Sequence, residues 1–250
     1  MKRLICAVTI WLICTGTGFG SDALVGLYNR GNELYRAGDF ESAVSAYEGV
    51  IAQGVIDGQV FYNLGNAYYK NRQLGRAILS FERALKLMPG DVDVLANLAF
   101  ANAQKTDRES SEDVNLLTRI LGAIYDFFGL DALALMVCFF LFGLGGVVVG
   151  WIFVPVRRLL WGSLLVVLGC AFLASASLLA FKIHEYQIPR AVVLSEEAVG
   201  RSGPGTDFLQ VFTLHEGTKV AIERVEGRWL LVRVRAGLGG WLEVSMLERI

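Results

Sequence analysis

Two long apolar runs constrain the fold of this chain more than any other feature of its sequence. They extend over Ala132–Val154 and Leu159–Phe181, and neither contains a charged residue. Each run has 23 residues. A helix of that length measures about 35 Å, enough to cross the roughly 30 Å hydrocarbon core of a bilayer with some tilt. Only residues 155–158 separate the runs. We therefore predict an antiparallel hairpin of two transmembrane helices, with the segments before and after it on the same side of the membrane.

The first twenty residues indicate which side of the membrane that is. Met1–Arg3 is positively charged, Leu4–Cys14 is apolar but too short to span a bilayer comfortably, and Thr15–Gly20 is rich in small residues. This pattern predicts a secretory signal peptide over residues 1–20, removed by cleavage. An uncleaved anchor and a lipoprotein signal at Cys14 are the alternatives.

Export would place the turn at residues 155–158 in the cytoplasm and both soluble parts outside it. Arg157 and Arg158 agree with this orientation, because cytoplasmic loops carry an excess of positive charge. The cysteines lie in the signal (Cys6 and Cys14) and in the apolar runs (Cys138 and Cys170). The exported parts therefore have neither disulfides nor thiol chemistry.

Between residues 24 and 91 the sequence repeats itself at a period of 34. The second copy, residues 58–91, resembles the tetratricopeptide repeat at eight positions where that family places bulky, small or terminating residues: Phe61, Leu64, Gly65, Tyr68, Ala77, Phe81, Ala84 and Pro89. The first copy, residues 24–57, departs from the pattern at Arg30 and Val55. Residues 92–105 repeat the start of the motif and are expected to cap the stack. The resemblance implies an all-α array of helix pairs that rely on their neighbours for burial.

Arrays of this family bind other proteins along a concave face, which is lined by the first helix of each pair. The resemblance implies a partner-binding set of Tyr28, Asn32, Tyr35 and Arg36 from the first repeat, Tyr62, Asn66, Tyr69 and Lys70 from the second, and Phe100 and Gln104 from the cap. Tyrosines supply large contact areas at low entropic cost, and asparagines can pair with the amides of an extended peptide. The alternative is that these are ordinary consensus residues of the repeat.

Two segments join the array to the membrane. Residues 106–113 form a charged linker, and residues 114–130 carry apolar side chains at helical spacing. This spacing predicts an amphipathic helix at the membrane interface, or else an extension of the first spanning helix. Within that spanning helix, Gly146 and Gly150 form a small-xxx-small pair. Such a pair permits close helix–helix contact, either inside the hairpin or with a second membrane protein.

From residue 189 onward the pattern changes to short β runs separated by glycine-containing turns. The expected strands are Ala191–Leu194, Leu209–Leu214, Thr218–Val225, Trp229–Arg235 and Gly240–Val244. The ordered set Arg201–Gly205, Glu216–Thr218, Gly227–Trp229 and Gly240–Trp241 resembles the bacterial SH3 domain, although Gly200 stands where many members have valine. The resemblance implies a small all-β SH3-like barrel over residues 189–250. Phe208, Trp229 and Trp241 are candidates for its recognition groove; the alternative is that the tryptophans close the barrel.

The whole arrangement, namely a signal, a short tetratricopeptide array, a transmembrane helical hairpin and a bacterial SH3 domain, resembles the membrane proteins of the bacterial aerotolerance (Bat) operon. The resemblance implies a multidomain protein of the bacterial inner membrane, with periplasmic domains that act with von Willebrand A-domain membrane proteins and a MoxR-type ATPase. We therefore expect a non-enzymatic scaffold for protein partners in envelope stress or aerotolerance. A peptidoglycan-binding or sensing module is the alternative.

Other classes of function have little support in the sequence. The net charge is −1, and basic residues do not outnumber acidic ones in residues 21–113 or in residues 189–250, so both soluble parts lack the basic field that nucleic-acid binding requires. A cell-wall hydrolase would need a catalytic constellation, but the two histidines, His184 and His215, have no evident third partner for a triad or a zinc site. We expect no catalytic residue, no metal and no cofactor.

Overall fold

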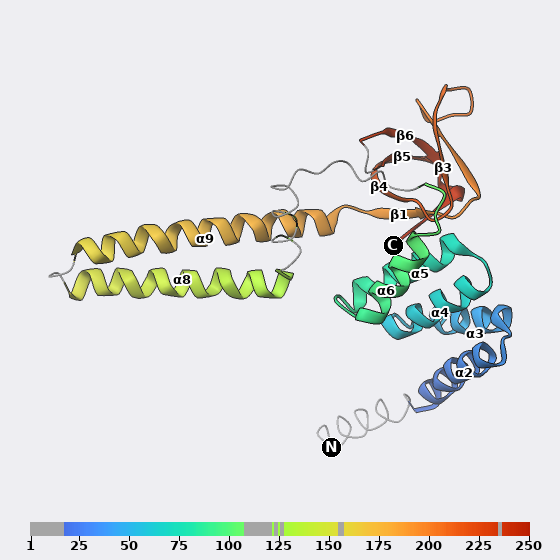
Figure 1. Cartoon of the computed structure of the whole chain (residues 1–250), viewed down its shortest axis with the longest axis horizontal. Coiled ribbons are helices and arrows are strands. Elements are labelled where there is room, and N and C mark those ends of the chain that lie inside the picture. The colour runs from blue at the N-terminus through green and yellow to red at the C-terminus, as the bar shows by residue number, and fades with distance from the viewer. Residues whose placement is uncertain (1–17, 108–121, 123–124, 126–127, 155–157, 235–236) are drawn as a thin grey trace, which may run out of the picture. The chain divides into compact units, whose positions relative to one another are not determined.

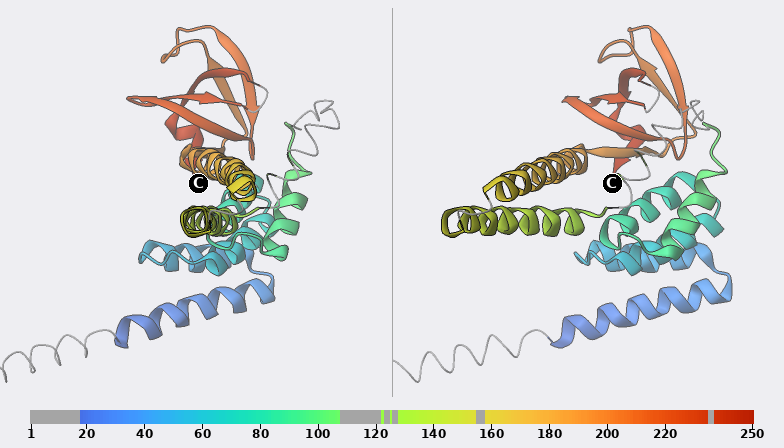
Figure 2. Two further views of the ribbon diagram at one scale, coloured as in Figure 1. Left: turned by 90° about the vertical axis from the view of Figure 1, so that its left-hand side faces the viewer. Right: turned by 60° about the vertical axis from the view of Figure 1, so that its left-hand side comes forward.

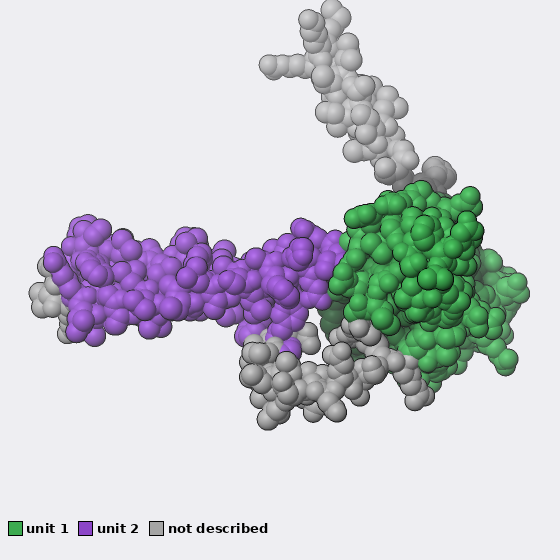
Figure 3. Space-filling model, turned by 90° about the horizontal axis from the view of Figure 1, so that it is seen from above, with its two compact units in different colours: residues 1–109, 189–250 green, residues 110–188 purple. Residues whose placement is uncertain are grey.

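The computed structural model describes residues 18–107, 122, 125, 128–154, 158–234 and 237–250. The chain divides into two compact units (Figure 3). Residues 1–109 and 189–250 form the first, which we call the array–sheet unit, and residues 110–188 form the second, which we call the hairpin unit.

Five helices form the array: α2 (Gly18–Ala37), α3 (Phe40–Ala52), α4 (Gly58–Lys70), α5 (Leu74–Leu87) and α6 (Val92–Asn102) (Figure 1). Asp39, Asp57 and Asp91 cap α3, α4 and α6, because each carboxylate accepts hydrogen bonds from main-chain N–H groups of the first turn. Gly38 and Gly90 stand in turns with φ values of +82° and +86°, which glycine adopts without strain.

Consecutive helices of the array pack closely because two glycines lie at equivalent positions of the repeat. A Cβ atom at Gly31 would lie 2.6 Å from the ring of Tyr47, and one at Gly65 would lie 2.6 Å from the ring of Phe81. Each ring is only 1% exposed. The 34-residue period therefore reflects a repeated packing contact: in each helix pair, an aromatic ring of the second helix lies on a glycine of the first helix.

Seven strands form one antiparallel sheet: β1 (Arg190–Val193), β2 (Glu197–Arg201), β3 (Gln210–His215), β4 (Lys219–Glu226), β5 (Trp229–Arg233), β6 (Gly239–Glu243) and β7 (Leu247–Arg249), with a 3-10 turn, Val244–Met246, before β7. Their order is β3-β2-β6-β5-β4-β1-β7. The sheet is coloured orange to red in Figures 1 and 2. Among the described strands, β3 and β7 stand at opposite ends of this order. The sheet is therefore open, and the closed SH3-like barrel predicted from the sequence is not confirmed.

The sheet buries alternate residues of its strands. Leu230 and Val232 of β5 are buried at 2% and 0% exposure, whereas Arg233 is exposed, as period-two alternation predicts. Gly200, which departs from the SH3 pattern, has a local explanation: a Cβ atom there would lie 2.2 Å from the ring of Phe212. The Phe212 ring thus occupies the space that a valine side chain at position 200 would fill.

The array and the sheet share one hydrophobic core. Val192 of β1 is fully buried in the same cluster as Ile78 of α5, and Leu194 and Ile250 pack against that cluster. The sequence suggested two separate soluble modules. The structure instead joins them along α5.

The hairpin unit consists of α8 (Leu130–Phe153) and α9 (Arg158–Gln187). An 18-residue stretch of each has a mean hydropathy of 2.6 and 2.5, respectively, and both helices are long and apolar enough to cross a membrane. The second helix continues six residues beyond the predicted span, which was expected to end at Phe181. Lys182 and Glu185 on this extension bind the residues before α8. The Lys182 ammonium donates to the main-chain oxygens of Tyr125 (2.8 Å) and Phe128 (2.5 Å), and the Tyr125 hydroxyl donates to Glu185.

Several sequence predictions lie outside the described residues. These are the signal peptide up to residue 17, most of the linker 106–113, and most of the amphipathic segment 114–130. Residues 18–20, the end of the predicted signal peptide, form the first turn of α2. Cleavage after Gly20 stays a prediction.

Candidate partner-binding face

The predicted partner-binding residues lie on α2, α4 and α6, except Gln104, which follows α6, and four of them accept hydrogen bonds from two other asparagines of these helices. The Asn63 amide donates to the Tyr28 hydroxyl (2.8 Å) and to the Asn32 side-chain oxygen (3.2 Å). One repeat later, the Asn97 amide donates to the Tyr62 hydroxyl (3.0 Å) and to the Asn66 oxygen (2.8 Å). We call this repeated set the asparagine ladder.

The ladder changes the role that the sequence suggested for these side chains. The Tyr47 hydroxyl also donates to Asn32 at 2.7 Å, so that asparagine accepts two hydrogen bonds within the array. The Gln104 amide donates to the Tyr69 hydroxyl, and the Phe100 ring packs edge-on against the Tyr69 ring. The Tyr47–Asn32 bond lies within one helix pair, whereas the bonds made by Asn63, Asn97 and Gln104 join residues about one repeat apart and so hold neighbouring repeats together. The asparagines are therefore structural residues as well as surface residues.

Other side chains of the same face are exposed. Arg36 and Lys70, which occupy equivalent positions of the two repeats, are both exposed. A hollow of about 90 Å³ lies beside Arg36, Asn32 and Asn66. Phe100 is 61% exposed at the far end of the face. The resulting surface combines two cations with aromatic rings and amides.

Two tyrosines stay protonated in this region across the physiological pH range. Burial is the main cause that raises the pKa of Tyr47 to about 12, and burial together with a hydrogen bond to Glu48 raises the pKa of Tyr68 to about 12. Both hydroxyls therefore act as neutral hydrogen-bond donors.

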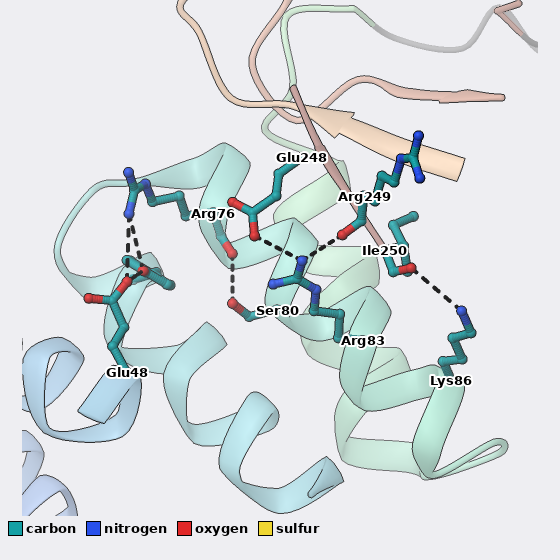
Figure 4. A network of polar contacts seen from close by, with 9 residues as sticks. Glu48, Arg76, Ser80, Arg83, Lys86, Glu248, Arg249 and Ile250 are labelled. Carbon is teal, nitrogen blue, oxygen red and sulfur yellow. Dashed lines mark hydrogen bonds and ion pairs between the residues drawn. The ribbon is translucent and has the colours of Figure 1, made fainter. Parts of the chain in front are cut away.

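A second hollow, of about 250 Å³, lies where α3, α4 and α5 meet β7, and the sequence did not predict it. Its polar wall is drawn in Figure 4, where Arg76 reaches Glu48 and Arg83 lies between Glu248 and the main chain of Arg249. The Arg83 guanidinium is 2.8 Å from the Glu248 carboxylate. The Arg83–Glu248 pair connects the array to the sheet, and the Arg76–Glu48 pair joins α5 to α3 within the array, so all four charges have partners within the unit.

Further polar contacts join the array to the β3–β4 turn. The Glu216 carboxylate accepts a hydrogen bond (3.3 Å) from the main-chain N–H of Gly75, in the first turn of α5, whose own N-cap residue makes no side-chain bond. Lys219 pairs with Glu82 at 2.7 Å. An anion at a helix N-terminus is stabilised by the unpaired N–H groups and the helix dipole. The sheet thus supplies the cap that α5 lacks.

The three predicted groove residues of the sheet do not share one environment. Trp241 of β6 is 8% exposed and lies opposite Leu231, whereas Trp229 lies opposite Glu243 on the same pair of strands. Phe208 is 47% exposed and packs on Gly203 before β3 begins. Trp229 and Trp241 are thus diagonal neighbours. Phe208 lies outside the strands, and its main-chain oxygen accepts a hydrogen bond (3.0 Å) from Arg201, which is paired with Trp241 across β2 and β6.

The two glycines of the predicted small-xxx-small pair, Gly146 and Gly150, also differ in their surroundings. A Cβ atom at Gly150 would lie 2.6 Å from the Trp161 ring of α9, so this glycine packs within the hairpin. Around Gly146 no described atom lies within 4 Å of such a Cβ atom. Of the pair, Gly146 alone is open to another helix.

Within the described residues, no group of three or more histidine, cysteine, aspartate or glutamate side chains could hold a metal ion.

Comparison with known proteins identifies one region. A family model described as "Tetratricopeptide repeat" matches residues 28–92. No curated protein matches the chain. Among matching solved structures is the second TPR of Spaghetti (RPAP3) bound to HSP90 peptide SRMEEVD, with 21% identity, a TM-score of 0.31, and coverage of 42% of this chain and 85% of that one. Residues 28–92 therefore contain tetratricopeptide repeats, a module typical of non-enzymatic protein interaction.

Proposed function

We propose that this chain is a non-enzymatic, membrane-anchored scaffold that binds segments of partner proteins along the face formed by α2, α4 and α6. The repeats support protein binding, and α8 and α9 support anchoring. In this proposal the soluble unit lies at the outer face of a bacterial inner membrane, where the signal-like residues 1–20 and the Arg157–Arg158 pair would place it.

The observation that carries the proposal is that some residues of this face bond to one another within the array, whereas others are exposed. The asparagine ladder fixes the first helices relative to one another. Arg36 and Lys70 are exposed, and among the residues that the structure describes they make no hydrogen bond or ion pair. A rigid face loses little entropy when a partner binds. Two cations one repeat apart, beside Tyr35 and Tyr69, suit a segment that carries carboxylates and apolar side chains.

The remaining features give the proposal its finer form. The arrangement predicted from the sequence is that of protein E of the Bat operon, so membrane proteins with von Willebrand A domains are the partners we propose to test first. In the same proposal the sheet is a relative of the bacterial SH3 domain whose docking on α5 stiffens the array.

Charge reversal tests the proposal without disturbing the fold. Arg36→Glu combined with Lys70→Glu changes two exposed side chains, and we expect at least a tenfold loss of partner proteins that co-purify from detergent-solubilised membranes. Arg224→Glu with Arg228→Glu, the same charge change on exposed positions of the sheet, is the control and should leave co-purification unchanged. Equal recovery from both double variants would contradict the proposal.

A further inference from the structure

The hollow where α3, α4 and α5 meet β7 lies outside the partner-binding face, and the groups that line it are those of a small-molecule site. Its volume is about 250 Å³. Pockets that hold drug-sized ligands measure roughly 300–1,000 Å³, so this hollow suits a smaller molecule. Both the array and the sheet contribute to its wall (Figure 4). A ligand bound here would therefore contact both halves of the array–sheet unit.

The floor of the hollow is apolar. Leu64 and Leu79 line it and are only 4% and 3% exposed, and Ile51 packs against the same hydrophobic cluster. Ser80 is also part of the lining, but its hydroxyl donates to the main-chain oxygen of Arg76 at 2.9 Å. The floor therefore favours an apolar side chain of the ligand.

Two cation–anion pairs form the wall above this floor. Arg76 lies 3.7 Å from Glu48, and Arg83 lies 2.8 Å from Glu248. The two arginines are seven residues apart on α5, which separates their Cα atoms by about 10 Å along the helix axis. The hollow thus has a charged pair toward each end, and the four charges sum to zero.

Both pairs keep hydrogen-bonding atoms that no other group uses. A guanidinium carries N–H donors on each of its nitrogens. Among the residues that the structure describes, Arg76 bonds only through Nη1, to Tyr68 and Glu48, and Arg83 bonds only through Nη2, to the sheet. In the same part of the chain, only the Oε1 atoms of Glu48 and Glu248 have partners. The wall can therefore donate to a carboxylate and accept from an ammonium group while its own pairs stay intact.

This combination of groups disfavours simpler ligands. A plain anion would be repelled by the two carboxylates as much as it is attracted by the two guanidiniums, and the reverse holds for a plain cation. An apolar molecule would cover charged groups without giving them hydrogen bonds. A molecule that carries both signs of charge and an apolar side chain satisfies the wall and the floor together.

We propose that this hollow binds a short zwitterionic peptide, of two or three residues, that carries an apolar side chain. Its carboxylate accepts hydrogen bonds from the guanidinium of one pair, and its ammonium group donates to the carboxylate of the other. The apolar side chain lies on Leu64 and Leu79. An extended chain covers about 3.5 Å per residue, so two or three residues reach about 7–10 Å, which is the scale of the distance between the pairs along α5. The site does not depend on the proposed scaffold function, because it uses neither Arg36 nor Lys70.

Titration calorimetry of the full chain in detergent tests this site, with alanyl-leucyl-alanine as the probe. N-acetylation of the probe removes its ammonium group, and amidation of its other end removes its carboxylate. We expect saturable binding of the free tripeptide and at least tenfold weaker binding of each blocked form. Two results would overturn the proposal: no saturable binding at millimolar concentrations of the free tripeptide, or equal affinity for a blocked form. Equal affinity for the N-acetylated form would show that the hollow takes the carboxyl end of a longer chain instead.

Two variants with matched controls locate the binding in the hollow. Arg76→Gln should weaken it at least fivefold, whereas Arg224→Gln, which removes an equally exposed ion pair of the sheet, should leave it unchanged. Ala52→Phe places a ring in the hollow from the exposed end of α3 and should abolish binding. Gln53→Phe, at the next exposed position but outside the hollow, is its control. Thermal unfolding midpoints show which variants are folded, and full binding by a folded Ala52→Phe or Arg76→Gln chain would contradict the assignment.

Discussion

At the scale of single residues, the contact between Asp107 and His215 makes the join between array and sheet sensitive to pH. The His215 ring nitrogen lies 2.7 Å from an Asp107 oxygen. The hydrogen bond with Asp107 is the main cause that raises the pKa of His215. Burial acts to raise the pKa of Asp107, but hydrogen bonds from the His215 main chain and ring and from Thr218 outweigh it, and the pKa falls below its usual value.

The signs of these shifts define a pH window. The raised pKa of His215 means that its contribution to stability is complete below about pH 6.5 and is lost as pH rises through the folded-state value. The lowered pKa of Asp107 means that its contribution is complete above about pH 4 and is lost as pH falls through the folded-state value. We expect His215→Gln to lower the thermal unfolding midpoint of the detergent-solubilised chain more at pH 5.5 than at pH 8.5. His184→Gln is the control, and an equal effect of His215→Gln at both pH values would contradict the assignment.

The asparagine ladder gives a second prediction at residue scale. Asn63→Ala removes the bonds to Tyr28 and Asn32, and we expect a loss of about 1–2 kcal/mol in the free energy of unfolding, because both partners are part-buried. Asn29 occupies the same position of the first repeat but is exposed. Asn29→Ala should therefore change stability by less than about 0.5 kcal/mol. Chemical denaturation of the two variants compares them directly, and equal losses would show that the ladder contributes nothing specific.

At the scale of elements, α5 connects the two halves of the array–sheet unit. Its residues Ala77, Phe81 and Ala84 are buried in the array. On another face, Gly75 meets Glu216 and Glu82 meets Lys219 of the sheet. The helix is thus buried on two sides, as expected for a helix between two packed layers.

The Gly217 turn tests this docking. Gly217 has a φ of +83°, and a Cβ atom there would lie 2.6 Å from Ile78 of α5. Gly217→Ala should cost roughly 1–2 kcal/mol for the backbone conformation and a further 1–3 kcal/mol for overpacking. Gly227 also has a positive φ, +58°, but open space around it, so Gly227→Ala should show only the backbone cost. Thermal unfolding of both variants measures the difference, and identical losses would argue against tight docking.

Much of the element structure could be predicted from the sequence, because it depends on local patterns. The 34-residue period follows from glycines and aromatic rings that recur within one helix pair, and five strands follow from alternation between turns. The strands β2 and β7 were missed: the first contains Gly200 and ends in charged residues, and the second has three residues. The docking on α5 was missed because Gly75 and Glu216 are 141 positions apart and no local pattern connects them. Asn32 and Asn66 could be recognised as equivalent from the 34-residue period. Their role as hydrogen-bond acceptors within the array could not be predicted, because it depends on contacts between helices that no local pattern connects.

At the scale of the whole molecule, the chain combines a face suited to protein segments with two helices suited to a membrane. The apolar runs Ala132–Val154 and Leu159–Phe181 contain no charged residue, which suits them to the core of a bilayer. We therefore expect a protein that acts by holding others in place.

Site-specific photo-cross-linking in intact cells can identify the proteins that the face formed by α2, α4 and α6 binds. A photoreactive amino acid is placed at Lys70, on the proposed binding face, and in a second strain at Gln53, an exposed residue at the end of α3. We predict discrete adducts with one or a few membrane proteins, identified by mass spectrometry, from position 70 and at least tenfold less of them from position 53. Adducts of the same kind and yield from both positions, or none from position 70, would contradict the account.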